Sequence, residues 1–339
     1  MAHIKEVAEK AGVSISTVSR ALSGKVVVDP ETKKRVLQAV KELNYQPNVL
    51  AKSLKEGRSK TIGLILPNLK NLVFPAAIRG ITEIAKKYGY TLVLCNTDED
   101  LDTEKRYVDN LKQRLVDGLI FSTATPASSH IHQLKEEGYP VVLMLRSLSD
   151  DYDTVMIDNF DGGYQAAKCL LERGYRKIAL INGPLDLILY SQRYAGYLAA
   201  LREAGVTVDD QLIIHQTQGW EDGFVAIREL LERGIKFDAV FGTSDPKALG
   251  AMKAIKEYGL RVPDDVAVIG YDNLDMSELT DPPLTTMAQP FYEVGVQAAE
   301  RLLKLINSKK KLKPELVKLR TKLLIRKSVG FGSFYQSNN

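Results

Sequence analysis

Six times between residues 80 and 262 the sequence passes from a helical segment through a glycine to an apolar residue. This order is typical of a helix that ends in the left-handed conformation at glycine, with a hydrophobic contact after it. Apolar runs such as Val141–Leu145 and Val266–Ile269 indicate strands that are buried on both faces. Alternation of such strands with helices predicts parallel α/β sheets. The six glycine steps are Gly89-Tyr90, Gly138-Tyr139, Gly174-Tyr175, Gly205-Val206, Gly234-Ile235 and Gly259-Leu260.

The alternation begins only after Thr61, and the residues before it differ in charge. Residues 1–60 contain twelve Lys and Arg against six Asp and Glu, whereas the rest of the chain has 34 basic and 36 acidic side chains. Positive charge confined to one end indicates a head that binds a polyanion on a near-neutral body. A basic surface that is merely exposed to solvent would give the same excess of basic residues. A binding motif is therefore needed to support the interpretation that this end binds a polyanion.

Residues 1–46 supply that motif, since they contain short helical patterns with tight turns. Gly12 breaks a first amphipathic helix, and Ser14 is a good N-cap for a second helix over about Ile15–Leu22. Asp29-Pro30 predicts the start of a third helix. Two short helices joined by a glycine-containing turn form a helix-turn-helix, although an ordinary helical hairpin has the same pattern.

The outer face of the second helix would carry Ile15, Ser16, Ser19 and Arg20. Such a face fits the DNA major groove, where Arg can bind guanine through two hydrogen bonds and apolar groups touch thymine methyls. We therefore expect a sequence-specific DNA-binding head.

Further motifs run along nearly the whole chain, and they are Val7-Ala8, Ala11–Ser14, Thr17–Arg20, Leu43–Asn48, Asn182-Gly183-Pro184, Arg193, Ser244–Gly250, Ile269–Asn273, Pro283–Thr286 and Gln289-Pro290. In these motifs the chain resembles the lactose-repressor (LacI/GalR) family, and its head and linker are most similar to the purine repressor. The resemblance implies an N-terminal all-α helix-turn-helix domain and a two-lobed α/β body of the periplasmic-binding-protein-like (type I) class with parallel sheets.

The resemblance also implies domain boundaries and roles in the head. Residues 1–46 would form the DNA-binding domain and 47–59 a hinge helix and linker. The first lobe would contain 60–160 with 290–318, and the second 161–289 with 319–339. Ile15, Ser16 and Arg20 would read base edges, while Ser14, Thr17 and Ser19 would contact phosphates or support the helix. Leu54, beside Lys55, would enter the minor groove as an apolar wedge.

The body is expected to bind a small effector between its lobes, at the carboxyl ends of the strands. Carboxylates accept hydroxyl hydrogens, arginine donates a fork and an aromatic ring covers an apolar sugar face, so a sugar or sugar derivative fits best. Leu187 stands where the purine repressor has an arginine, which argues against a purine corepressor. The effector contacts implied by the resemblance are Phe74, Arg193, Asp245 and Asp272, with Arg146 and Trp220 as further candidates.

We expect a homodimer that acts as a repressor and binds a pseudo-palindromic operator of double-stranded DNA. The sequence leaves open whether the effector induces or corepresses, and whether a non-sugar corepressor or a protein partner replaces it. A sugar-binding protein without a regulatory role is the rival class. The sequence has no leucine heptads at its end of the kind that the family's tetrameric members carry, which is why a dimer is expected.

We expect no enzymatic activity and no cofactor, because no phosphate loop, catalytic triad or redox pair is found. His130-x-His132 is not expected to bind metal, since we foresee no acidic or thiol partner near it. The two cysteines, the lack of an apolar signal core and the lack of a long apolar run lead us to expect a reduced, cytoplasmic protein that does not enter a membrane.

Overall fold

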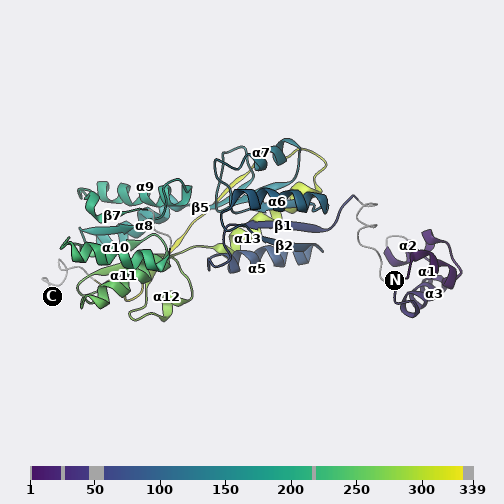
Figure 1. Ribbon diagram of the computed structural model, residues 1–339, viewed down its shortest axis with the longest axis horizontal. Coiled ribbons are helices and arrows are strands. Elements are labelled where there is room, and N and C mark those ends of the chain that lie inside the picture. Colours follow the sequence, from purple (N-terminus) through teal and green to yellow (C-terminus); the bar gives the residue numbers. More distant parts are fainter. Residues whose placement is uncertain (1, 24–26, 46–56, 216–218, 331–339) are drawn as a thin grey trace. The chain divides into compact units, whose positions relative to one another are not determined.

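The computed structural model describes residues 2–23, 27–45, 57–215 and 219–330. The chain divides into two compact units, Met1–Lys60 and Thr61–Asn339 (Figure 1). Within the described ranges, no helix is both long enough and apolar enough to cross a membrane.

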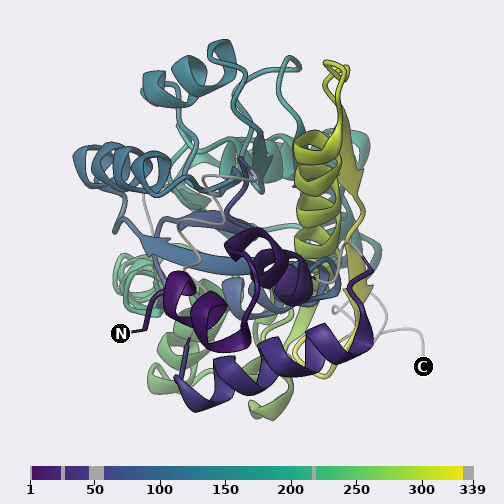
Figure 2. The same cartoon turned by 90° about the vertical axis from the view of Figure 1, so that its right-hand side faces the viewer.

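The first unit is a bundle of three helices, α1 (Ile4–Ala11), α2 (Ile15–Ser23) and α3 (Pro30–Glu42). Figure 2 shows the long α3 beside the two shorter helices. Their buried faces share one small core around Val7, Val18 and Val36. All three helices were predicted from the sequence, and the structure confirms them.

The local signals that delimit these helices also hold. Gly12 ends α1 in the left-handed conformation with φ of 62°. Ser14 Oγ accepts a hydrogen bond from the backbone N–H of Thr17, 3.2 Å away, and so caps α2. Asp29 caps α3 by accepting the N–H of Thr32 at 3.0 Å, with Pro30 in the first turn.

The second unit contains two six-stranded sheets, and the first is parallel throughout. Its strand order is β11-β5-β4-β3-β1-β2. Helices α5 and α13 cover one face of this sheet, and α6 and α7 cover the other (Figure 1). The bounds are β1 Thr61–Leu66, α5 Phe74–Lys87, β2 Thr91–Asn96, α6 Leu101–Gln113, β3 Gly118–Phe121, α7 Ser129–Glu136, β4 Val141–Met144, β5 Thr154–Ile157, α13 Phe291–Asn307 and β11 Leu316–Leu319.

The second sheet has the order β12-β10-β9-β8-β6-β7 and is parallel except for the edge strand β12, which runs antiparallel to β10. Helices α8 and α9 cover one face, and α10 and α11 cover the other. The bounds are α8 Asn159–Glu172, β6 Ile178–Ile181, α9 Ile188–Glu203, η1 Asp210–Leu212, β7 Ile213–Ile214, α10 Trp220–Glu232, β8 Ala239–Gly242, α11 Asp245–Glu257, β9 Ala267–Asp272, α12 Met276–Leu279, β10 Thr285–Ala288 and β12 Lys322–Leu324.

All six glycines that the sequence pattern singled out have a positive φ, between 66° and 90°. Most L-residues avoid this conformation, so glycine is what lets each helix turn directly into the next strand. At Gly89, for example, the N–H of the following Tyr90 returns to the carbonyl of Ala85 at 2.8 Å. The predicted α/β alternation is therefore confirmed step by step.

The chain passes between the two sheets three times, through the connections β5 to α8, β10 to α13 and β11 to β12. β11 ends at Leu319, so the boundary expected between 318 and 319 falls inside a strand. Helix α8 begins at Asn159 and packs along α9, slightly before the expected start of the second lobe at 161.

Candidate DNA interface and effector site

The recognition face of α2 lies opposite the core of the head. Val18 and Ala21 are buried, whereas Ile15, Ser16 and Arg20 are exposed. Arg20 donates from its guanidinium to Ser16 Oγ at 3.3 Å. The three residues that the sequence assigned to base reading therefore lie on one exposed surface of a helix.

The three residues assigned to phosphate contact or support form the start of the same helix. Ser14 Oγ lies 2.8 Å from Ser16 Oγ and 2.9 Å from Thr17 Oγ1. Ser14 is exposed, while Thr17 and Ser19 are half-buried. Hydroxyls and N–H groups at a helix start are suited to phosphate oxygens. Leu54 and Lys55, the expected minor-groove residues, lie outside the described residues.

In the second unit, Arg193 of α9 is the centre of the polar residues at the carboxyl ends of the strands. It is buried, its Nε donates to Asn159 Oδ1 at 2.9 Å, and Nη1 donates to the carbonyl of Thr243 at 2.5 Å. Its guanidinium also stacks over the ring of Tyr271, 3.7 Å from the ring centre. Asn159 follows β5 and Thr243 follows β8, so Arg193 links the ends of strands from both sheets.

Asp272 ends β9 beside this arginine. It is buried, and Oδ1 accepts a hydrogen bond from Gln289 Nε2 at 2.5 Å. Burial raises the pKa of Asp272 to about 7, against the opposing attraction of Arg193. Its φ of 121° is unusual for a residue with a side chain. Strained, buried and charged residues of this kind collect at binding sites.

Asp245, the other expected carboxylate, is fully buried and turned toward the protein. Oδ2 accepts from Leu274 N at 2.8 Å and from Ser277 Oγ at 2.5 Å, while Oδ1 accepts from Thr286 Oγ1 at 2.6 Å. These bonds tie the start of α11 to α12 and β10. Burial raises the pKa of Asp245 despite these donors. Its observed contacts are structural.

The three further candidates, Phe74, Arg146 and Trp220, differ in burial and partners. Phe74 is buried in the apolar core of the first sheet, where Leu274 also packs. Arg146 follows β4, donates to the carbonyl of Thr123 and forms an ion pair with Glu99 at 2.5 Å. Trp220 begins α10 and is 46% exposed. Arg193, Asp272 and Asp245 lie close enough to interact electrostatically, and effector contacts by Phe74, Arg146 and Trp220 stay predictions.

Two residues that sequence reasoning missed adjoin Arg193. Lys247 of α11 is fully buried, and its Nζ donates to Tyr190 Oη and Ser244 Oγ, both at 3.3 Å. The Tyr190 ring lies 4.6 Å from Lys247 Nζ and 5.7 Å from the guanidinium of Arg193. Tyr190 precedes Arg193 by three residues, a spacing that places both on one face of α9 and could have revealed it.

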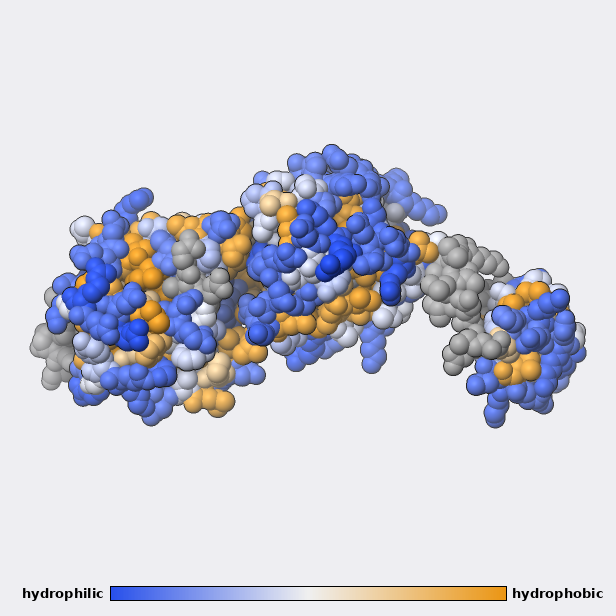
Figure 3. Space-filling view, in the orientation of Figure 1, coloured by the Kyte–Doolittle hydropathy of each residue, from blue (hydrophilic) through white to orange (hydrophobic). Residues whose placement is uncertain are grey.

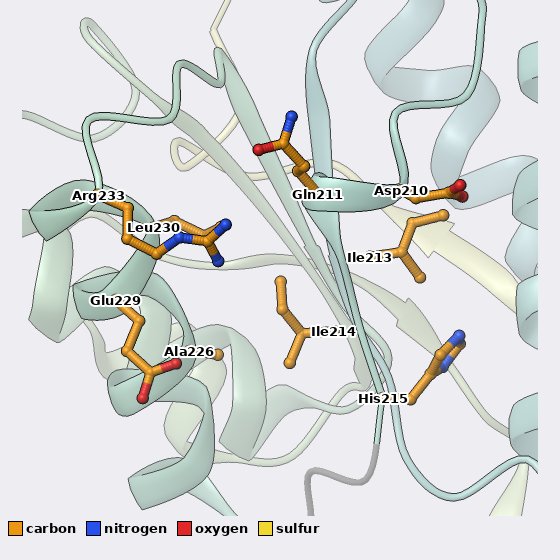
Figure 4. A pocket seen from close by; sticks show the side chains of 9 residues that line it. All are labelled: Asp210, Gln211, Ile213, Ile214, His215, Ala226, Glu229, Leu230 and Arg233. Atoms are coloured by element: carbon orange, nitrogen blue, oxygen red, sulfur yellow. The ribbon is translucent and has the colours of Figure 1, made fainter.

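Two surface hollows are lined in part by η1 and by none of these residues. One, of about 470 Å³, is lined by residues of η1, β7 and α10, with Glu229 on α10 and Arg233 directly after the end of that helix (Figure 4). The other, of about 680 Å³, lies between the start of β6 and the end of α9. Neither is lined by an expected effector residue.

The expectation that His130 and His132 have no acidic partner nearby was wrong. His130 Nε2 lies 2.6 Å from Glu104 Oε1, from α6, and His132 Nε2 lies 3.2 Å from Glu136 Oε1. Glu104 precedes His130 by 26 residues, so only the packing of α6 on α7 reveals the contact. In the described part of the chain, no group of three or more His, Cys, Asp or Glu could hold a metal ion.

A helix-turn-helix head and a two-sheet body with buried polar groups at the strand ends define a class, the effector-binding transcription regulators. Two family descriptions match the chain. "Bacterial regulatory proteins, lacI family" matches residues 3–48, and "Periplasmic binding proteins and sugar binding domain of LacI family" matches residues 59–327.

Similar proteins agree with both matches. The HTH-type transcriptional regulator RegA of Clostridium saccharobutylicum is 37% identical, covering 96% of this chain and 98% of its own. The HTH-type transcriptional repressor PurR of Histophilus somni is 38% identical, covering 97% and 99%.

Solved structures give the same result. The lac repressor dimer bound to operator and the anti-inducer ONPF has a TM-score of 0.87 at 30% identity, covering 96% of this chain and 98% of that chain. The complex of the transcriptional regulator CelR with cellobiose has a TM-score of 0.74 at 33% identity, covering 97% and 100%. This chain belongs to the LacI family. It is a transcription regulator with an effector-binding domain, and not an enzyme.

Proposed function

We propose that this regulator is a repressor that binds a pseudo-palindromic operator as a homodimer, and that a small polar effector, a sugar or sugar derivative, controls its affinity for DNA. Arg193 and Asp272 contact the effector, and Ile15, Ser16 and Arg20 read the operator bases. Asp245 supports the effector site from behind through its contacts with Ser277 and Thr286.

The main support for the effector proposal is the position of Arg193 at the ends of strands from both sheets. One buried guanidinium is held by the end of β5, the end of β8 and a residue of β9. A ligand that bonds to Arg193 would therefore affect strand ends of both sheets at once. A shift of one lobe against the other is a common way to transmit such a contact to a distant site.

A sugar-like effector is supported by chemistry and by relatives. Arginine, a carboxyl group and the Asn159 amide beside aromatic rings suit a ring of hydroxyls with an apolar face. CelR was solved with cellobiose, and a LacI-family regulator from Enterococcus faecium was solved with ribose.

Dimerisation is supported by exposed apolar side chains. Leu72 and Leu94 are 56% and 43% exposed, and Leu279 of α12 is 84% exposed. Figure 3 shows hydrophobic residues gathered along the side of the body where Figure 1 places β2 and α5. Exposed apolar patches of this kind mark interfaces between proteins, and a two-fold dimer requires a two-fold related DNA site.

The test begins with selection of an operator from random double-stranded DNA by the full chain. Recovery of an inverted repeat, and a dimeric mass by light scattering, is the expected result. A panel of sugars is then screened for compounds that change operator affinity at fixed salt. An asymmetric single site, a monomeric complex or a panel without any effect on a protein that binds its operator would contradict the respective part of the proposal.

A further inference from the structure

The connection from α13 to β11 carries four lysines, Lys309, Lys310, Lys311 and Lys313, which together form what we call the lysine loop. All four are exposed, and none of them takes part in an ion pair among the described residues. Figure 2 shows the loop, in yellow-green, projecting beyond the end of α13. The loop therefore presents four positive charges to the solvent.

The acidic residue nearest to the loop along the chain is already engaged. Glu315 pairs with Nη1 of Arg301 at 2.7 Å, and Arg301 is only 8% exposed. Nη2 of the same arginine donates to the carbonyl of Lys313 at 2.6 Å. At the other end of the loop, Ser308 Oγ donates to the carbonyl of Lys310 at 2.7 Å. The backbone of the loop is thus fixed at both ends, and Glu315 is held by a buried arginine.

Charge is divided unevenly over the body of the protein. Residues 309–327 contain nine Lys and Arg and one acidic residue, whereas residues 61–308 and 328–339 contain 25 Lys and Arg and 35 Asp and Glu. Most of the body therefore repels a polyanion, and this stretch is where one can approach. Lysines on an edge strand also prevent edge-to-edge pairing of sheets, a role that fits Lys318 of β11. The lysine loop lies before that strand, so edge protection does not account for it.

The register of the first sheet places the loop toward the edge at which the chain enters from the head. All six strands of the sheet are parallel, and through the strands between them Leu316 of β11 is level with Ile65 of β1. β1 begins four residues before Ile65, at Thr61, and Lys313 stands three residues before Leu316. The lysine loop and the start of β1 therefore lie at the same edge of the sheet.

Operator DNA that is bound by the head stays within reach of this edge. Between Tyr45 and the second residue of β1 the chain has the sixteen residues 46–61, which span at most about 58 Å. Such a tether keeps the effective concentration of DNA near the body high, so that even a weak contact can form. Duplex DNA is stiff over about 150 base pairs, so the flanks of an operator continue in line past the bases that the head contacts.

We propose that the lysine loop binds the phosphate backbone of duplex DNA beside the operator, outside the bases that the head reads. Each lysine that contacts a phosphate releases counterions, and the contact carries no sequence preference. The loop adds affinity for an operator within long DNA and leaves the choice of sequence to the head. This inference requires DNA binding by the head, but it does not depend on the effector or on the number of subunits.

The test compares the selected operator alone with the same operator extended by about 20 base pairs of unrelated sequence on each side. In the full chain, all four lysines of the loop are replaced with glutamine. On the extended duplex, the slope of log affinity against log salt should become shallower by at least about 1.8, which corresponds to two lost phosphate contacts. The advantage of the wild type should therefore shrink about 12-fold between 50 and 200 mM salt. On the operator alone, both proteins should bind alike, which also shows that the variant is folded.

A control variant removes the same number of charges elsewhere on the body. It carries glutamine in place of four exposed lysines of the second lobe, and its salt slope should match that of the wild type on both duplexes. Arginine at all four positions of the lysine loop should also retain the wild-type slope, because the charge is kept. The four control positions are Lys177, Lys236, Lys253 and Lys256.

Three results would overturn the inference. The first is wild-type affinity and slope of the glutamine variant on the extended duplex, which is also the result expected if an acidic protein were the partner of the loop. The second is an equal loss on both duplexes, and the third is an equal loss in the control variant. Either of these would show a general effect of net charge, and binding to the operator alone would still report on the head by itself.

Discussion

The guanidinium carbon of Arg193 lies 3.7 Å from the centre of the Tyr271 ring, within stacking distance. Tyr271 belongs to β9 and immediately precedes Asp272, so one strand places both the ring under the arginine and the carboxyl group beside it. Gly162 of α8 packs against the same ring so closely that a Cβ there would collide with it. Arg193 is therefore held in position by the fold before an effector binds.

Replacing Arg193 with lysine should abolish the response to effector while operator binding remains. Lysine keeps the charge, but it cannot reach Asn159 and the Thr243 carbonyl together or stack on Tyr271 as a plane. Operator affinity is measured with and without an active sugar. Arg202→Lys, exposed on the same helix, is the control, and a full response in Arg193→Lys would contradict the role of Arg193.

Replacing Asp272 with asparagine should change how stability depends on pH. The pKa of Asp272 rises from 3.8 to about 7 on folding, so the folded state holds this proton more tightly. Its contribution to stability is complete below about pH 4 and is lost as pH rises to 7.

The melting temperature of Asp272→Asn minus that of the wild type should therefore increase between pH 4 and 7, by the equivalent of at most about 1.4 kcal/mol per pH unit. Asp275→Asn, at an exposed position nearby, controls for removal of a carboxylate. If the difference in melting temperature between Asp272→Asn and the wild type does not depend on pH, the pKa of Asp272 is not raised by folding.

Replacing Gly196 with alanine should destabilise the body. Helices α8 and α9 cross closely there, and an added Cβ would collide with the backbone of Phe160 and Tyr164. Overpacking of this kind costs about 1–3 kcal/mol. Urea unfolding followed by circular dichroism measures the loss, with Ala195→Ser, at the exposed neighbouring position, expected to change little. Wild-type stability in Gly196→Ala would show that the helices can separate at no cost.

Replacing Arg20 with lysine should weaken binding to the selected operator by about 1–3 kcal/mol, the value of one two-pronged contact with a guanine. Binding to unrelated DNA should stay nearly unchanged, because the charge is kept. Fluorescence anisotropy at one salt concentration compares both DNAs. Lys41→Arg, on α3, is the control. An equal loss on both DNAs would assign Arg20 to the phosphate backbone.

The sequence by itself determined the helices of the head, the alternation of strands and helices, and the six glycine stops. These features depend on interactions within a few residues, such as the Ser14 and Asp29 caps or the left-handed turn at Gly89. It also supplied the motifs that resemble the LacI family, and from them Arg193 and Asp272 as candidates for the effector site.

Only the tertiary structure decided which polar residues meet. Asp245, which the resemblance names as an effector contact, bonds to Ser277 and Thr286, 32 and 41 residues away. Lys247 forms a hydrogen bond with Tyr190, 57 residues away in the sequence, and Arg146 forms one with Glu99, 47 residues away. Such pairs form because two helices or strand ends are packed side by side. Local sequence patterns do not predict how these elements pack against one another. The residues that surround Arg193 could therefore be identified only from the folded chain.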